Sequence, residues 1–234
     1  MTTSETTKKN VLLVGASSDL GQSILTELEK RGHTVIGTYH TNQVRPELRQ
    51  MDVTSSDSTN RTIQAAIAEV GTIDAAIFCS AIDRSELIRY ADIEGWQAVM
   101  DINFFGAVRL TKALLPHYLT NSAGIFLYIS SGMATRSNIG TAAYAASKAA
   151  LNALSLGLSK EHAKNGISTF TVMPGFFEGG LMKDMDEKRK SRISTLIDSK
   201  RIGNAKEIAQ FCIAAMENSS YLSGSNLEIN GGLA

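Results

Sequence analysis

Short apolar runs alternate with polar segments of helical character along most of the chain. The runs VLLV at residues 11–14 and TVIGTY at residues 34–39 have the length and residue types of buried parallel strands. Between them, residues 22–31 place apolar side chains at helical spacing. Strands that alternate with helices predict an α/β fold built on a parallel sheet.

The same pattern continues to the end of the chain. It predicts further strands at residues 48–53, 73–78, 125–129, 167–173 and 221–230. It predicts helices at residues 60–70 and 94–119, and another in the alanine-rich run that follows residue 140. The link at residues 40–47 is too short for a crossover helix, so we expect a tight loop there. Residues 1–9 are polar and predict a flexible N-terminal tail, which leaves residues 10–234 as a single domain.

Composition adds exclusions to this picture. The 234 residues carry 23 basic and 23 acidic side chains, a balance that argues against a nucleic-acid partner. No segment has the length of a membrane span or the core of a signal peptide, so we expect a cytoplasmic protein without a membrane partner. Cys79 and Cys212 are far apart, and the four histidines show no ligand spacing, so no metal site is expected.

One stretch, residues 130–151, places a hydroxyl, a phenol and an amine within reach of one another. Tyr144 and Lys148 are four residues apart in a predicted helix, so their side chains share a face. Ser131 follows the strand predicted at residues 125–129 and precedes Tyr144 by a loop. A nearby ammonium lowers the pKa of a phenol, so this set could protonate a carbonyl oxygen. The alternative is a half-buried aromatic, a lysine with an exposed head and a turn serine.

A glycine-bearing turn follows the first strand. Its sequence, GASSDLG, leads into a helix whose first turn would offer free N–H groups to a phosphate. This turn is similar to the G-x-x-x-G-x-G turn of the short-chain dehydrogenase/reductase family, with Asp19 in place of the middle glycine. We expect the Asp19 carboxylate to turn away from the phosphate, as a helix N-cap would.

Other motifs strengthen this resemblance. The pattern S-x(12)-Y-x-x-x-K of the family is matched by Ser131, Tyr144 and Lys148, and its W-x(6)-N-x-x-G pattern is matched around Asn103. Pro174 and Gly175 resemble the family's P-G turn, and the motifs follow one another in the family's order over nearly the whole chain. The resemblance implies a Rossmann-type, doubly wound, mainly parallel sheet of seven strands with helices on both faces.

The resemblance also implies a reaction. A carbonyl would be reduced, or the alcohol oxidised, by direct hydride transfer, with Tyr144 as general acid/base and Ser131 on the substrate oxygen. Lys148 would lower the pKa of Tyr144 and hold the nicotinamide ribose. Asn103 would hold a water that links Lys148 to solvent, or else would be a core amide bonded to backbone.

The cofactor is expected to be NADP(H), with NAD(H) possible. The end of the second strand, residues 38–42, has no acidic residue that would repel a 2′-phosphate. Asp52 would contact the adenine or cap a turn, and Cys79 is read as a buried thiol. The expected cofactor contacts are Gly15, Ser17, Ser18, Asp19, Leu20, Gly21, Tyr39, His40, Asp52, Val53, Cys79, Ser80, Ala81, Tyr144, Lys148, Pro174, Gly175 and Phe177.

The expected substrate is a small-molecule or carrier-bound carbonyl compound, such as a ketone or a β-ketoacyl chain. Residues 176–200 are predicted to form a mobile lid over it. The resemblance further implies a homodimer or homotetramer. Three other readings stay open: a nucleotide-binding sensor or scaffold with a degenerate site, a family member that catalyses a reaction without net redox change, and a non-enzymatic interaction module.

Overall fold

The computed structural model describes residues 7–183 and 185–233. The first six residues of the predicted tail lie outside this range. The predicted fold class is confirmed, because seven parallel strands form one sheet in the order β3-β2-β1-β4-β5-β6-β9. These strands are β1 Asn10–Val14, β2 Thr34–Tyr39, β3 Arg49–Gln50, β4 Ala75–Phe78, β5 Gly124–Ile129, β6 Ile167–Pro174 and β9 Ser225–Ile229. The strand order reverses between β1 and β4, which makes the doubly wound topology.

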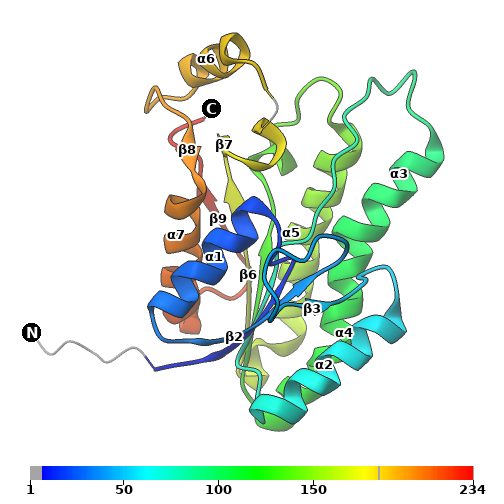
Figure 1. Ribbon diagram of the computed structural model, residues 1–234, viewed down its shortest axis with the longest axis vertical. Coiled ribbons are helices and arrows are strands. Elements are labelled where there is room, and N and C mark those ends of the chain that lie inside the picture. The colour runs from blue at the N-terminus through cyan, green and yellow to red at the C-terminus, as the bar shows by residue number, and fades with distance from the viewer. Residues whose placement is uncertain (1–6, 184, 234) are drawn as a thin grey trace, which may run out of the picture.

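Helices cover both faces of the sheet (Figure 1). The helices are α1 Asp19–Lys30, α2 Ser56–Val70, α3 Ile93–Met100, α4 Gly106–Asn121, α5 Ala142–His162, α6 Glu187–Leu196 and α7 Ala205–Glu217. On β1, Val11 and Leu13 pack towards α1 and α7, whereas Leu12 and Val14 pack towards α2, α4 and α5. This alternation of buried side chains explains why the run VLLV is apolar throughout.

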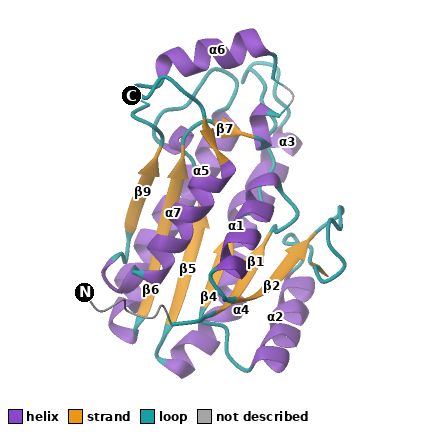
Figure 2. Ribbon diagram, turned by 60° about the vertical axis from the view of Figure 1, so that its left-hand side comes forward, coloured by secondary structure: helices purple, strands orange, loops and turns teal. Residues whose placement is uncertain are grey.

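The carboxyl ends of β6 and β9 point towards the end of the molecule where helix α6 lies (Figure 2). A small separate pair of strands, β7 Phe177–Glu178 and β8 Gly203–Asn204, is also found there. Residues 176–200, the predicted lid, contain β7, a 3₁₀ turn at Gly180–Met182 and α6. Its mobility stays a prediction.

Several predicted boundaries were wrong. The helix expected at residues 94–119 is interrupted by a π-helical segment, Asp101–Phe105, which separates α3 from α4. The strand expected at residues 48–53 pairs with β2 only at Arg49 and Gln50. The last strand begins at Ser225, because Tyr221 ends a 3₁₀ turn and is fully exposed. Helices α1 and α2 begin earlier than expected, since Ser18 and Ser55 cap them.

No helix in the described part of the chain is long and apolar enough to cross a membrane.

Candidate active site

The carboxyl end of β5 and the start of α5 bring the predicted catalytic residues together. Ser131 follows β5 and caps a short 3₁₀ turn, with its Oγ accepting a hydrogen bond from the Met133 N–H at 3.1 Å. Tyr144 and Lys148 lie one turn apart on α5, and the Lys148 Nζ is 5.5 Å from the centre of the Tyr144 ring. The same three groups that the spacing predicted therefore share one place in the fold.

Lys148 ties α5 to the end of β5. Its Nζ donates to the Ile129 carbonyl at 2.7 Å, and its own carbonyl accepts a hydrogen bond from Ser130 Oγ at 3.0 Å. The side chain is almost fully buried. Burial disfavours the charged form and lowers the pKa of Lys148 to about 8. The amine therefore remains mostly protonated at neutral pH.

Tyr144 differs from its sequence-based expectation. Burial is the main cause that raises the pKa of Tyr144, the charge of Asp83 raises it further, and the Ser131 hydroxyl opposes them. The net direction is opposite to the predicted lowering by Lys148, because removing the phenolate from water outweighs the favourable contacts. In this environment the phenol keeps its proton at neutral pH.

Asn103 lies in the π-helical segment and is completely buried. Its Nδ2 donates to the Ile82 carbonyl at 2.9 Å and to Ser147 Oγ at 3.0 Å, and its Oδ1 accepts from the Ile82 N–H at 2.8 Å. These contacts agree with the second reading of Asn103, an amide bonded to backbone. The water relay through Asn103 stays a prediction.

The glycine turn has the shape of a phosphate cradle. Gly15 has a φ of +87°, and a Cβ there would lie 2.8 Å from the backbone N of Ser80. A Cβ at Gly21 would lie 2.1 Å from the Gly15 carbonyl oxygen. Within the described residues, the N–H groups of Asp19 and Leu20 at the start of α1 meet no protein acceptor. These free donors at a helix N-terminus fit the diphosphate of a dinucleotide.

The N-cap of α1 is Ser18, so the capping role expected for Asp19 was wrong. Ser18 Oγ accepts from the Gly21 N–H at 3.0 Å. The Asp19 carboxylate turns instead towards the segment after β7, where its Oδ2 accepts from the Gly180 N–H at 2.9 Å and Lys183 Nζ is 3.9 Å from Oδ1. The carboxylate is thus held away from the free amides.

Several of the other expected cofactor residues lie at the ends of strands. Seven of them lie at or just beyond the carboxyl ends of the parallel strands β1, β4 and β6, namely Gly15, Ser17, Cys79, Ser80, Pro174, Gly175 and Phe177. Leu20 is buried in the core, so its side chain cannot face a ligand. Burial raises the pKa of the Cys79 thiol, as its reading as an inert cysteine predicts.

The adenine end of the expected site lies beyond β2 and β3. Asp52 accepts from both the N–H and the Oγ1 of Thr54, which lower the pKa of Asp52. This is the turn-capping role, and its contact with adenine stays a prediction. His40 is exposed and lies 4.0 Å from Asp52.

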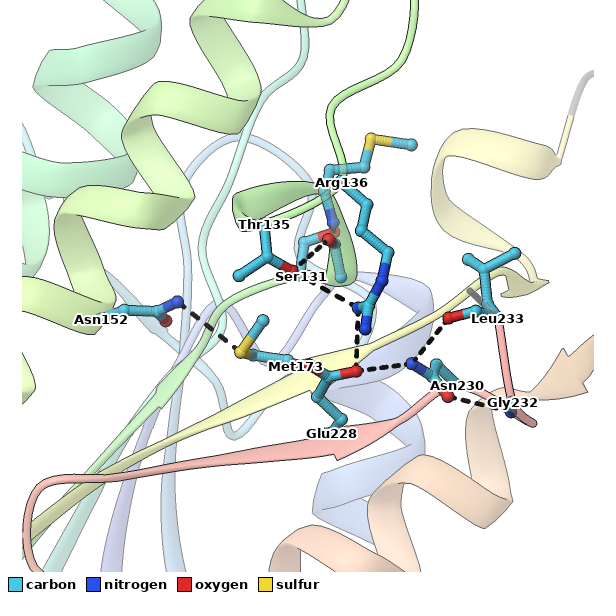
Figure 3. Close-up of polar contacts among 11 residues, drawn as sticks. Ser131, Thr135, Arg136, Asn152, Met173, Glu228, Asn230, Gly232 and Leu233 are labelled. Carbon is cyan, nitrogen blue, oxygen red and sulfur yellow. Dashed lines mark hydrogen bonds and ion pairs between the residues drawn. The ribbon is translucent and has the colours of Figure 1, made fainter.

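Sequence reasoning missed an ion pair next to Ser131. Arg136, in the loop after Ser131, donates from Nη1 to Glu228 Oε2 on β9 at 2.9 Å (Figure 3). Asn230 Nδ2 donates to the same oxygen at 2.7 Å, and its Oδ1 accepts from the Gly232 N–H. Opposite charges 92 residues apart give no signal in the sequence.

The doubly wound sheet, with a glycine turn after its first strand and Ser131, Tyr144 and Lys148 near the end of β5, defines the class as a Rossmann-type α/β protein. The profile of the family described as short chain dehydrogenase matches residues 9–190. The chain belongs to the short-chain dehydrogenase/reductase family. It is thus an oxidoreductase, and the family implies a nicotinamide cofactor and carbonyl substrates.

Curated relatives align along nearly the full chain. The chain is 29% identical to the 3-oxoacyl-[acyl-carrier-protein] reductase FabG of Salmonella typhimurium over 96% of its length and 97% of the relative. It is also 29% identical to the FabG of Escherichia coli strain K12 over the same shares. The acetoacetyl-CoA reductase of Allochromatium vinosum is 29% identical over 95% of this chain and 97% of that protein.

Proposed function

We propose that the protein is an NADP(H)-dependent reductase of a ketone or β-ketoacyl compound, with Tyr144 as general acid/base. The observation that carries this proposal is the convergence of Ser131, Tyr144 and Lys148 near the carboxyl end of β5. The substrate class is taken from relatives that are named as reductases of 3-oxoacyl and acetoacetyl thioesters.

The nicotinamide cofactor supplies the hydride when it is bound. In the reduction direction Ser131 binds the substrate oxygen, and Tyr144 gives its phenolic proton to that oxygen as negative charge develops there. The buried ammonium of Lys148 stabilises the phenolate that remains. In the oxidation direction the same groups act in reverse, so Tyr144 must first lose its proton.

The preference for NADP(H) is supported by the end of β2. Residues 38–42 contain no carboxylate that would repel a 2′-phosphate, and the exposed His40 follows directly after β2.

Thermal unfolding against NADPH and, separately, NADH tests the cofactor. A ligand that binds only the native state raises the unfolding temperature by an amount set by its affinity. We expect a larger rise with NADPH. A larger rise with NADH would refute the reading of residues 38–42, and no rise with either would refute the reductase.

The substitution Tyr144→Phe tests the chemistry. It removes the proton donor but leaves the ring, so cofactor binding by thermal shift should change little. Turnover of a carbonyl substrate should fall by about 10²-fold or more. The matched control is Tyr90→Phe, because Tyr90 is exposed. Turnover retained in Tyr144→Phe would contradict the assignment.

We also propose a homodimer or homotetramer assembled through α4 and α5. Phe105, Leu119 and Leu156 expose large apolar side chains on or next to these helices. The exposed small residues Ala146 and Ala153 of α5 permit close approach of a second copy. Light scattering at micromolar concentration should give twice or four times the mass of the chain, and a monomer would contradict the proposal.

A further inference from the structure

Asp83 carries a carboxylate oxygen that lacks a protein donor. This residue lies in the segment that follows β4. Its Oδ2 accepts a hydrogen bond from Ser85 Oγ. Its Oδ1 is buried, and no donor for it exists in the part of the chain that the structure describes. A buried carboxylate oxygen without a hydrogen bond is costly, so such a group calls for an explanation.

Two sets of backbone contacts fix the segment around Asp83. On one side, the N–H and C=O of Ile82 are both bonded to the Asn103 amide, at 2.8 Å and 2.9 Å. On the other side, the Glu86 N–H donates to the Gly140 carbonyl at 2.8 Å, in the loop that precedes α5. Asp83 is therefore held beside the start of the helix that carries Tyr144.

The direction of the Tyr144 pKa agrees with this placement of Asp83. The negative charge of Asp83 is, after burial, the largest cause that raises the pKa of Tyr144. Among the ion pairs of the described residues there is none between Lys148 and Asp83, and the Lys148 Nζ donates to the Ile129 carbonyl instead. Asp83 thus has one carboxylate oxygen without a protein donor, in the segment that is bonded to the loop before α5.

We propose that Asp83 is a specificity residue that accepts a hydrogen bond from the substrate. The preferred substrates then carry a donor, a hydroxyl or a protonated amine, next to the reacting carbonyl. Substrates with a carboxylate at that position are rejected by charge repulsion. This inference rests on the proposed carbonyl reduction, for which it names the substrate class.

Three aryl ketones of similar size test the inference. 2-Hydroxyacetophenone carries the donor, propiophenone replaces it with a methyl group, and benzoylformate replaces it with a carboxylate. We expect kcat/KM of the wild-type protein with its preferred cofactor to fall in that order. An order that places propiophenone or benzoylformate first overturns the inference without the need for any variant.

Variants then assign the preference to Asp83. Asp83→Val removes the acceptor and should reduce the ratio of kcat/KM for 2-hydroxyacetophenone over propiophenone by about tenfold or more. Asp83→Asn keeps a weaker, neutral acceptor and should give a smaller loss. Both should raise kcat/KM for benzoylformate. The control Glu86→Gln removes an exposed carboxylate of the same segment and should leave the ratio unchanged.

The outcomes separate the two proposals. If the protein reduces ketones but both Asp83 variants keep the wild-type ratio, the inference is overturned and the reductase stands. A graded loss from Asn to Val supports it, because a merely structural role would affect all three ketones alike. If no ketone is reduced with NADPH or NADH, the proposed function fails and the inference fails with it.

Discussion

A buried cation at the centre of the site affects stability as well as chemistry. Lys148 has a pKa lowered by burial from 10.5 to about 8. Between these two values the unfolded chain binds a proton that the folded chain does not, so this residue makes stability rise with pH there. Below pH 8 the folded protein carries the full cost of the buried charge, about 3 kcal/mol.

We therefore predict that Lys148→Met removes a pH-dependent cost. At pH 7 the free energy of unfolding of this variant should exceed that of the wild type. The loss of the hydrogen bond to the Ile129 carbonyl offsets part of this gain. The difference should shrink as the pH rises from 8 towards 10.5. Urea unfolding at several pH values measures it, and parallel curves for the two proteins would contradict the lowered pKa.

At Tyr144, the raised pKa predicts different pH responses for the two reaction directions. Alcohol oxidation needs the phenolate, so its kcat/KM should rise with pH into the alkaline range. Carbonyl reduction needs the phenol and should stay level through neutral pH. Ser131 lowers the pKa of Tyr144, so residual oxidation by Ser131→Ala should rise at higher pH than in the wild type. Profiles of kcat/KM against pH in both directions measure this, and a midpoint near neutral pH would contradict it.

At the scale of the elements, the two helix caps Ser18 and Ser55 offer a matched comparison. Each serine accepts a hydrogen bond from a first-turn N–H, of Gly21 in α1 and of Ser58 in α2. Replacing either by alanine should cost about 1 kcal/mol of stability. Only Ser18→Ala, in the glycine turn, should also weaken cofactor binding in a titration. Equal cofactor affinities of the two variants would contradict the placement of the cofactor at α1.

Periodicity predicted most of the elements, because each strand or helix buries its own apolar face. It failed at residues 101–105, because a single π turn keeps apolar side chains on nearly the same side of the helix. It failed at residues 48–53, since Leu48 and Val53 are buried but lie outside the paired residues of β3. The length of a strand depends on its partner, which a local pattern does not contain.

In the candidate site, too, features set by local spacing were predictable and features set by distant contacts were not. Tyr144 and Lys148 were predictable because one helix sets their separation. The orphan oxygen of Asp83 was not, because its burial depends on contacts with residues far away in the sequence.

For the whole molecule, the pair Arg136–Glu228 joins the loop after Ser131 to the edge strand β9 (Figure 3). Both side chains are more than a third exposed, so the pair should add less than about 1 kcal/mol to stability. We predict that Arg136→Met changes KM for the carbonyl substrate several-fold and leaves the unfolding temperature nearly unchanged.

A double-mutant cycle with Glu228→Gln tests this coupling. If the pair acts as a unit, the second substitution should add little to the change in KM. The control is Arg49→Met, because Arg49 pairs with Glu69 at the opposite edge of the sheet. A KM that responds equally to both arginine substitutions would contradict a specific role for Arg136.

The position of β9 has a consequence for biosynthesis. Of the strands in the described sheet, β9 comes last from the ribosome, and its pairing with β6 covers Val172 and Met173. Until β9 arrives, β6 is an open edge that another nascent chain can join. Chains in which β9 pairs only weakly with β6 should therefore aggregate into inclusion bodies when they are expressed, instead of accumulating as a stable, inactive enzyme.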